Sequence, residues 1–108
     1  MPEQILQINF KLKVSTPEYE RMASPLASEF VAVPGLRWQI WLLNAAQGEA
    51  GGVCLFDDGS FVQAFLAGPL MTQIASHPAL SEVSVKQFDV MKGQTVITHG
   101  PIREGSRV

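Results

Sequence analysis

Four polar side chains in this sequence could stabilise a negative charge on a bound molecule. Gln7 and Asn9 alternate with apolar residues near the N-terminus, and Arg37 and Gln39 do so in a later run. Their N–H groups could donate hydrogen bonds to a phenolate or enolate oxygen, the kind of stabilisation that lets an electron-rich substrate react with dioxygen unaided. The alternative is that these residues lie on a solvated strand face or in an interface where their hydrogen bonds are satisfied. The pattern slightly favours this alternative over a role in charge stabilisation.

Three residues are candidate catalytic groups: Asn9, Glu49 and His77. Glu49 could act as a base if water were excluded from it, although a glutamate at the start of a strand is more often exposed. His77 could accept a proton or ligate haem iron, but a histidine before a proline at a helix end more often has a structural role. Both alternatives stay open.

The two tryptophans have different expected roles. Trp41 lies on the more polar side of its predicted strand, where it could stack on an aromatic substrate, although a tryptophan in a dimer core explains it equally well. Trp38 lies on the apolar side and is interpreted as a core residue. The candidate substrate-binding residues are Gln7, Arg37, Gln39, Trp41 and Phe88.

The first predicted elements are a strand and a helix. Residues from Gln4 to Val14 alternate strictly between apolar and polar side chains, which predicts an amphipathic strand. Thr16 to Glu18 suit a helix start, since threonine can cap, proline fits the first turn and glutamate complements the dipole. The helix should continue to Pro34. Pro25 should kink it or divide it in two, because proline removes a backbone donor.

A hairpin is predicted next. Gly35 to Asn44 and Ala50 to Phe56 are apolar runs joined by a short loop. Alternation along the first run predicts one set of side chains in the core and a second set in a pocket wall or interface. The core set is Leu36, Trp38, Ile40 and Leu42, and the second set is Arg37, Gln39, Trp41 and Leu43.

The remaining elements complete a recognisable order. Asp57 to Ser60 offer caps for a second helix, which Gly68-Pro69 should interrupt, and Leu80 to Met91 form a fourth strand. The order β-α-β-β-α-β predicts an α+β, ferredoxin-like fold, with an antiparallel four-stranded sheet and both helices on one face. We expect one domain over residues 1–92.

A C-terminal arm is expected over residues 93–108. Its glycines and proline make a long helix improbable. Thr95 to Thr98 form a short β-prone run that could add to a sheet edge. We therefore predict that this run pairs as an edge strand or extended arm at a dimer interface, and that Glu104 to Val108 are weakly held.

Composition excludes several function classes. The 108 residues carry a formal charge of −2 with scattered Lys and Arg, which argues against a nucleic-acid partner. The single cysteine, Cys54, excludes an internal disulfide and a multi-cysteine zinc site, and its apolar surroundings predict an inert side chain. No signal peptide or membrane helix is indicated, so no membrane partner is expected and the cytoplasm is the default location.

The predicted sheet has a second face that needs a cover. Helices should cover one face, yet the other is too apolar to be left in water. A second copy packed face to face would bury it in a symmetric homodimer and could leave a cavity between each sheet and its partner.

The chain contains the segments ILQINF, SPLASEF, PGLRWQIW, EAGGVCLF and KQFDV. Over roughly Ile5 to Val90 these segments resemble the YdhR family of small monooxygenases in the dimeric α/β-barrel superfamily. The Trp-x-x-Trp and Glu-Ala-Gly-Gly pieces are the most specific, and Pro25 matches a proline in the family's first helix.

The resemblance implies a dimeric α/β barrel of ferredoxin-like subunits. It also implies an oxygenase pocket facing the sheet that works without flavin or metal, so no cofactor or metal is expected. Gln39, Cys54 and Asn9 stand where the family is expected to have lysine, tyrosine and histidine. These departures concern the pocket and not the fold.

Three function classes remain open. The first is a cofactor-independent monooxygenase acting on a small aromatic or polyketide-like substrate in a pocket between the sheet and the dimer partner. The second is haem binding or degradation, because the haem-degrading branch of the superfamily pairs an asparagine on the first strand with a histidine on the second helix, as Asn9 and His77 are placed here. The third is a non-catalytic module that binds a small molecule.

Overall fold

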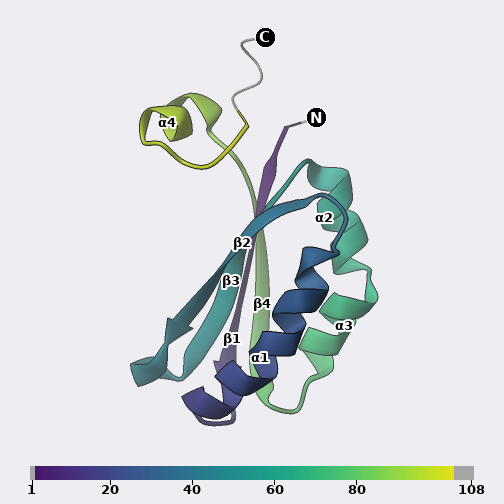
Figure 1. Cartoon of the computed structure of the whole chain (residues 1–108), viewed down its shortest axis with the longest axis vertical. Helices are drawn as coiled ribbons and strands as arrows, with labels where there is room; N and C mark the ends of the chain where they lie inside the picture. The colour runs from purple at the N-terminus through teal and green to yellow at the C-terminus, as the bar shows by residue number, and fades with distance from the viewer. Residues whose placement is uncertain (1, 104–108) are drawn as a thin grey trace.

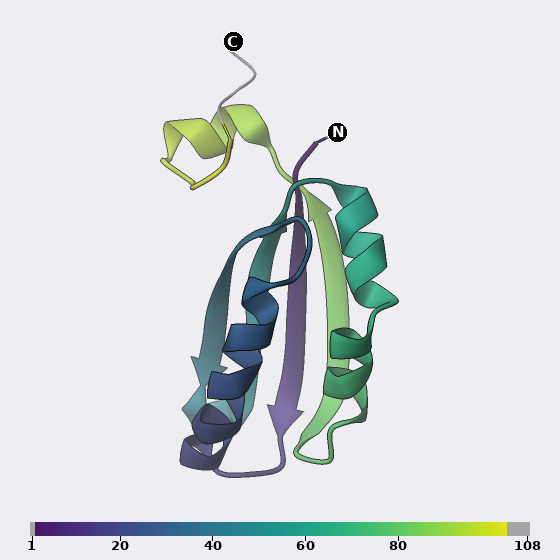
Figure 2. The same cartoon turned by 45° about the vertical axis from the view of Figure 1, so that its right-hand side comes forward.

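A four-stranded antiparallel sheet carries the fold in the computed structural model, which describes residues 2–103. The strands lie in the order β2-β3-β1-β4, and the helices α1, α2 and α3 cover one face of the sheet (Figures 1 and 2). This arrangement confirms the predicted α+β, ferredoxin-like fold. The element bounds are β1 Gln4–Leu12, α1 Thr16–Val31, β2 Leu36–Asn44, η1 Ala45–Gln47, β3 Glu49–Phe56, α2 Gly59–Leu66, α3 Pro69–Ser76, β4 Leu80–Asp89 and α4 Lys92–Ile97.

Short polar residues begin two of the helices. The Ser15 hydroxyl accepts a hydrogen bond from the Glu18 amide at 3.3 Å, so the cap of α1 is Ser15 and not Thr16 as predicted. Asp58 caps α2 and accepts from the Ser60 amide at 2.8 Å. The Ser60 hydroxyl and the backbone amides of Ser60 and Phe61 stabilise the charged form of Asp58 and lower its pKa.

The helix α1 stays in one piece. Pro25 lies in its interior, yet the helix is continuous from Thr16 to Val31, so the prediction of two shorter helices is wrong. The break at Gly68-Pro69 is present as predicted, and it separates α2 from α3.

The core lies between the sheet and the helices. Alternation along β1 directs Leu6, Ile8 and Phe10 toward the helices, and all three are buried. The Phe30 and Phe65 rings of α1 and α2 meet above them with centroids 5.7 Å apart. Apolar burial on this face is the main stabilising contribution to the fold.

One extra residue in β2 reverses the predicted faces of that strand. Leu36 is paired with Phe56 and Trp38 with the next residue, Leu55, so Arg37 is the additional residue of a β-bulge. A one-residue shift moves every later side chain to the opposite face. Trp38 is therefore not in the core between sheet and helices.

The pairing of β2 with β3 shows which β2 side chains face the helices. Trp41 and Ile8 are both paired with Gly52, and the Trp41 ring packs edge-on against Phe30 with centroids 5.7 Å apart. Trp41 thus faces the helices, together with Gln39 and Leu43. Trp38, Ile40 and Leu42, which were predicted to be core residues, lie on the opposite face of the sheet.

The face of the sheet away from α1, α2 and α3, here called the open sheet face, combines apolar and polar side chains. Its exposed large side chains are Ile40, with 53% of its surface accessible, and Phe88, with 46%. Leu55 is fully buried but does not belong to the helix-side core. The open sheet face carries Ile5, Gln7, Asn9, Trp38, Ile40, Leu42, Val53, Leu55, Ser84, Lys86 and Phe88.

The C-terminal segment differs from its prediction. Residues 92–97 form the short helix α4, which lies beyond the end of the sheet (Figure 1), so Thr95 to Thr98 do not form an edge strand within the chain. The chain then returns to the body, where the Trp38 indole N–H donates to the Pro101 carbonyl at 2.7 Å. Glu104 to Val108 lie outside the described residues.

Charged groups fix this returning segment. The carboxylate of Glu3, which is nearly buried, accepts hydrogen bonds from the Arg37 guanidinium and from the Arg103 amide. Asp57 accepts from the Arg103 guanidinium at 2.8 Å and lies 3.7 Å from Arg37 Nε. The network joins the start of β1, the start of β2, the end of β3 and residue 103. In residues 2–103, no helix is long and apolar enough to cross a membrane.

Two glycines with positive φ provide a matched test of packing. A side chain at Gly35, with φ of 78°, would overlap the Phe61 ring, whereas at Gly48, with φ of 59°, it would meet open space. Gly48→Ala should cost about 1–2 kcal/mol of backbone strain. Gly35→Ala should cost on the order of 1–3 kcal/mol more, because the core must also shift. Chemical denaturation measures both, and equal losses would contradict the close contact at Gly35.

Candidate functional site

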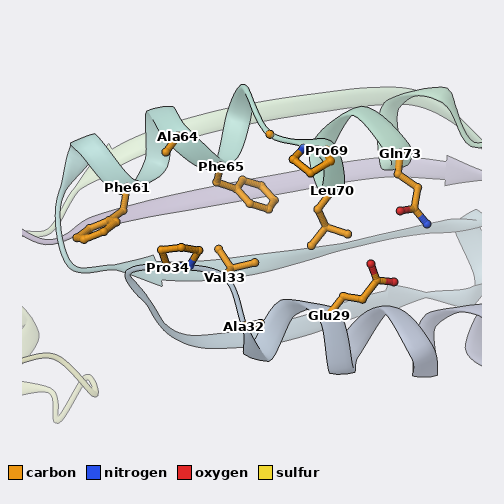
Figure 3. A pocket seen from close by; sticks show the side chains of 11 residues that line it. Glu29, Ala32, Val33, Pro34, Phe61, Ala64, Phe65, Pro69, Leu70 and Gln73 are labelled. Atoms are coloured by element: carbon orange, nitrogen blue, oxygen red, sulfur yellow. The ribbon is translucent and has the colours of Figure 1, made fainter.

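A groove lies between the C-terminal end of α1 with the turn that follows it and the α2–α3 pair, and we call it the helix groove (Figure 3). It has a volume of about 370 Å³, within the roughly 300–1,000 Å³ typical of small-molecule sites. Its walls are mostly apolar. They include Val33, Pro34, Phe61, Phe65, Pro69 and Leu70.

Two polar side chains lie at one end of the helix groove. Glu29 from α1 and Gln73 from α3 extend toward one another across it, while Phe61 lies at the far end (Figure 3). Glu29 is the one titratable residue among those that line the groove. The arrangement suits a flat apolar molecule whose polar end lies between a carboxylate and an amide.

Local sequence explains the shape of the groove. Phe61 and Phe65 are four residues apart on α2, so both project from one face of that helix. The chain breaks after Leu66 and restarts with Pro69, and the Gly68 amide donates to the Phe65 carbonyl at 3.0 Å. On the other side α1 ends at Val31, and Pro34 prevents its continuation. Both walls therefore include a helix boundary.

A second, smaller space lies beneath α1, between that helix and the sheet, and we call it the inner cavity. Its volume is about 30 Å³, and almost all the atoms at its surface are apolar. It is lined by Ile8, Phe10, Met22, Leu26, Phe30 and Ile74, with Tyr19, Gln39, Trp41, Gly52 and others.

Trp41 lines the inner cavity and two shallower hollows on the side of α1 that faces β2. One of these, with about 400 Å³, also contacts Tyr19 and Ala23, and the other, with about 360 Å³, also contacts Arg37 and Trp38. The helix α1 therefore has open space on both sides. The edge-on contact with Phe30 holds the Trp41 ring against α1.

The structure does not gather the predicted substrate-binding residues into one site. Gln7 donates to the Asn9 amide oxygen at 2.9 Å on the open sheet face, which Phe88 shares. Arg37 belongs to the charged network at the end of the sheet. Gln39 and Trp41 instead face α1 and line the inner cavity. No predicted site residue lines the helix groove.

The three candidate catalytic residues are also apart. Glu49 lies at the start of β3, 4.0 Å from the Lys11 ammonium. His77 is the C-cap residue of α3. Its ring Nδ1 accepts a hydrogen bond from the Ala79 amide at 3.1 Å, so the side chain has a structural role. Asn9 lies on the open sheet face and His77 on the helix side, so these two residues do not form the pair expected for haem.

Sequence reasoning missed the polar pair of the helix groove. Glu29 lies in the last turn of α1, and nothing in that stretch of sequence identifies what lies opposite it. Gln73 comes from α3, and its position opposite Glu29 depends on how the helices pack on the sheet. Among residues 2–103, no three His, Cys, Asp or Glu side chains are grouped so as to hold a metal ion.

Burial controls two ionisable groups near the inner cavity. It raises the pKa of the Tyr19 phenol and raises the pKa of the Cys54 thiol to about 12. Cys54 is fully buried in β3. Both groups are therefore neutral at physiological pH, and the predicted inert cysteine agrees with this environment.

Cys54 should resist thiol reagents while the protein is folded. At pH 8 the native protein should react with a disulfide-exchange reagent many times more slowly than it does in denaturant, because both access and thiolate formation are suppressed. Absorbance of the released thiolate measures the rate. Reaction of the native protein at the rate of a free thiol would show that β3 is accessible.

Comparisons with solved structures find the same fold. A variant of SnoaB from Streptomyces nogalater, described as a cofactor-independent oxygenase, is 18% identical with a TM-score of 0.69, and the match covers 84% of this chain and 95% of that chain. MhuD from Mycobacterium tuberculosis, described as a heme-degrader, is 22% identical with a TM-score of 0.63, covering 81% and 95%. The hydroxynitrile lyase of Passiflora edulis is 14% identical with a TM-score of 0.61, covering 83% and 95%.

Sequence comparison identifies the family. A search of curated proteins found no match. A family model described as "Putative mono-oxygenase ydhR" matches residues 5–101, which is most of the chain and includes β1 from its second residue, both walls of the helix groove and α4. The structural likenesses, all at low identity, agree in fold with this match. The chain therefore belongs to the YdhR family.

Proposed function

We propose that this protein is a cofactor-independent monooxygenase that oxidises a small aromatic or polyketide-like substrate in the helix groove. The observation that carries the proposal is an apolar groove of about 370 Å³ with one carboxylate and one amide at the same end. Family membership and the fold shared with an oxygenase support the reaction class. The groove replaces the predicted pocket between the sheet and a partner as the proposed site.

The groove suits a flat substrate. The Phe61 and Phe65 rings and the Pro34 and Pro69 rings supply rigid apolar walls that lose little conformational freedom when a ligand binds. The polar end distinguishes the two ends of a substrate. A fused-ring molecule with one acidic C–H or O–H group would place that group beside Glu29 and leave the rings among the aromatic side chains.

The proposed reaction begins with proton transfer. Glu29 removes a proton from an activated CH2 group of the substrate, and the Gln73 amide donates a hydrogen bond to the enolate oxygen that forms. The carbanion transfers one electron to dioxygen, and the resulting radicals combine into a peroxide. The protonated peroxide loses water, so that CH2 and O2 yield C=O and H2O. The substrate itself supplies all the electrons.

Glu29→Gln provides the test of this mechanism. Anthrone is a suitable probe, because it is a flat fused-ring compound with one acidic CH2 group. An oxygen electrode should show anthrone-dependent uptake with wild-type protein, and Glu29→Gln should lower kcat by about 10²- to 10⁴-fold, the usual contribution of a general base. KM for anthrone should change little.

Glu20→Gln is the matched control, because Glu20 is an exposed glutamate on the same helix that lies outside the helix groove. It should retain wild-type kcat. Anthrone binding without oxygen uptake would indicate a non-catalytic binding module. Equal activity of both variants would exclude Glu29 as the base.

We also propose that the protein forms a homodimer through the open sheet face. Ile40 and Phe88 are both about half exposed on this face. Trp38, Leu42 and Val53 add partly buried apolar surface beside them. A contiguous apolar area on one side of a sheet favours a symmetric partner that presents the same area.

Ile40→Asp tests the dimer. A charge buried within an apolar interface should weaken association by at least tenfold. Val31→Asp is the matched control, because Val31 is 86% exposed on α1, away from the open sheet face. Light scattering over a concentration series should show a wild-type and Val31→Asp dimer and an Ile40→Asp monomer. A wild-type monomer at micromolar concentration would contradict the proposal.

A further inference from the structure

The inner cavity beneath α1 is separate from the helix groove and has no role in the reaction described above. It lies between α1 and the central strands, and its surface is almost wholly apolar. We propose that the inner cavity binds dioxygen and supplies it to a substrate in the helix groove. This inference rests on the proposed oxygenase function, since only that reaction consumes the gas.

The size of the cavity selects a very small ligand. About 30 Å³ holds on the order of two water-sized spheres, because one such sphere needs roughly 10–15 Å³. A diatomic molecule fits this space, whereas an aromatic substrate does not. Size thus separates the gas site from the organic site.

The lining of the cavity selects an apolar ligand. A buried water molecule needs two to four polar partners, and cavities lined by aliphatic and aromatic groups stay dry and bind apolar guests such as xenon. The side chains of Ile8, Met22, Leu26 and Ile74 surround the space with methyl and methylene groups. Dioxygen is an apolar molecule and gains from leaving water for such surroundings.

A glycine in the sheet keeps the space open. Gly52 lies in β3 between its partners Ile8 in β1 and Trp41 in β2, both of which face the helices. Any other residue would add a side chain on this side of the sheet. A methyl group at position 52 would lie 3.2 Å from the Gln39 amide nitrogen and 3.3 Å from the Ile40 backbone carbonyl oxygen, so it fits only with a shift of a few tenths of an ångström.

The cavity is next to the helix groove. The Phe30 ring lines the inner cavity, and the Phe65 ring lines the helix groove. Their centroids are 5.7 Å apart. A molecule in the cavity is therefore separated from a bound substrate by one pair of aromatic rings.

Dissolved dioxygen is itself the probe for this site, because it is paramagnetic and speeds the relaxation of nearby nuclei. Under oxygen pressure, methyl NMR of the full chain should show relaxation enhancements at Ile8, Met22, Leu26 and Ile74 several-fold larger than at exposed methyl groups such as those of Val31. No organic substrate is needed for this measurement.

Two variants fill the cavity from opposite sides. Gly52→Ala adds a methyl group from the sheet, and Leu26→Phe adds a ring from α1, so the experiment survives if one variant fails to fold. Each should lower the enhancement at the cavity methyl groups several-fold. Each should also raise KM for dioxygen several-fold while KM for anthrone stays within twofold.

Gly93→Ala is the matched control, because a methyl group there meets nothing within 4 Å. It should leave both the enhancement and the kinetics unchanged. Cavity methyl groups no more enhanced than exposed ones, or an enhancement that persists in both filled variants, would overturn the inference. Enhancement without any anthrone oxidation would instead contradict the proposed function alone, and oxidation without enhancement would contradict this inference alone.

Discussion

The pairing of β2 with β3 determines which side chains face the helices. Because Arg37 is an extra residue in that pairing, every later side chain of β2 is directed opposite to a simple alternation that starts at Leu36. Trp41 consequently packs against Phe30 and closes one side of the inner cavity. Trp38 is directed to the other face, where Pro101 accepts its indole N–H. The bulge thus places the Trp41 ring on the helix side of the sheet and directs Trp38 to the side where it holds the C-terminal segment by a hydrogen bond.

The same end of the sheet concentrates the charged interactions of the chain. Glu3 is nearly buried, and its carboxylate is compensated by the Arg37 guanidinium and the Arg103 amide. A buried and paired charge of this kind contributes little net folding stability. Removing its partner, however, lowers the free energy of unfolding by roughly 3–5 kcal/mol, because the remaining charge is then buried without compensation. These contacts bring residues 3 and 103 together at the start of β2.

The sequence predicted the fold because the evidence for each element is local. Strict alternation from Gln4 to Val14, the cap at Asp58 and the break at Gly68-Pro69 depend on neighbours within a few residues. The faces of β2 could not be predicted in the same way, because a bulge is a property of a strand pair and not of one strand. The strand prediction for Thr95 to Thr98 was wrong for a related reason, since β propensity depends on pairing with another strand, and residues 92–97 form the helix α4 instead.

The candidate site was harder to predict than the fold. Asn9 and His77 match a haem-type pattern in sequence, yet the sheet separates them. Glu29 and Gln73 carry no motif, and their proximity comes from the packing of α1 and α3 on one face (Figure 3). Chemistry that depends on two helices meeting across a groove leaves little trace in either helix alone.

The open space on both sides of α1 has a consequence for how this protein can change over time. Stability comes mainly from the sheet and the aromatic contacts on its helix side, while the α1 residues Glu20, Ala23, Ala27 and Glu29, which border the open spaces, are only partly packed. Substitutions at such positions remove few contacts, so they cost little folding free energy. Proteins with this fold can therefore evolve grooves of different width and charge while the sheet and core stay intact, so that one architecture can bind many small molecules.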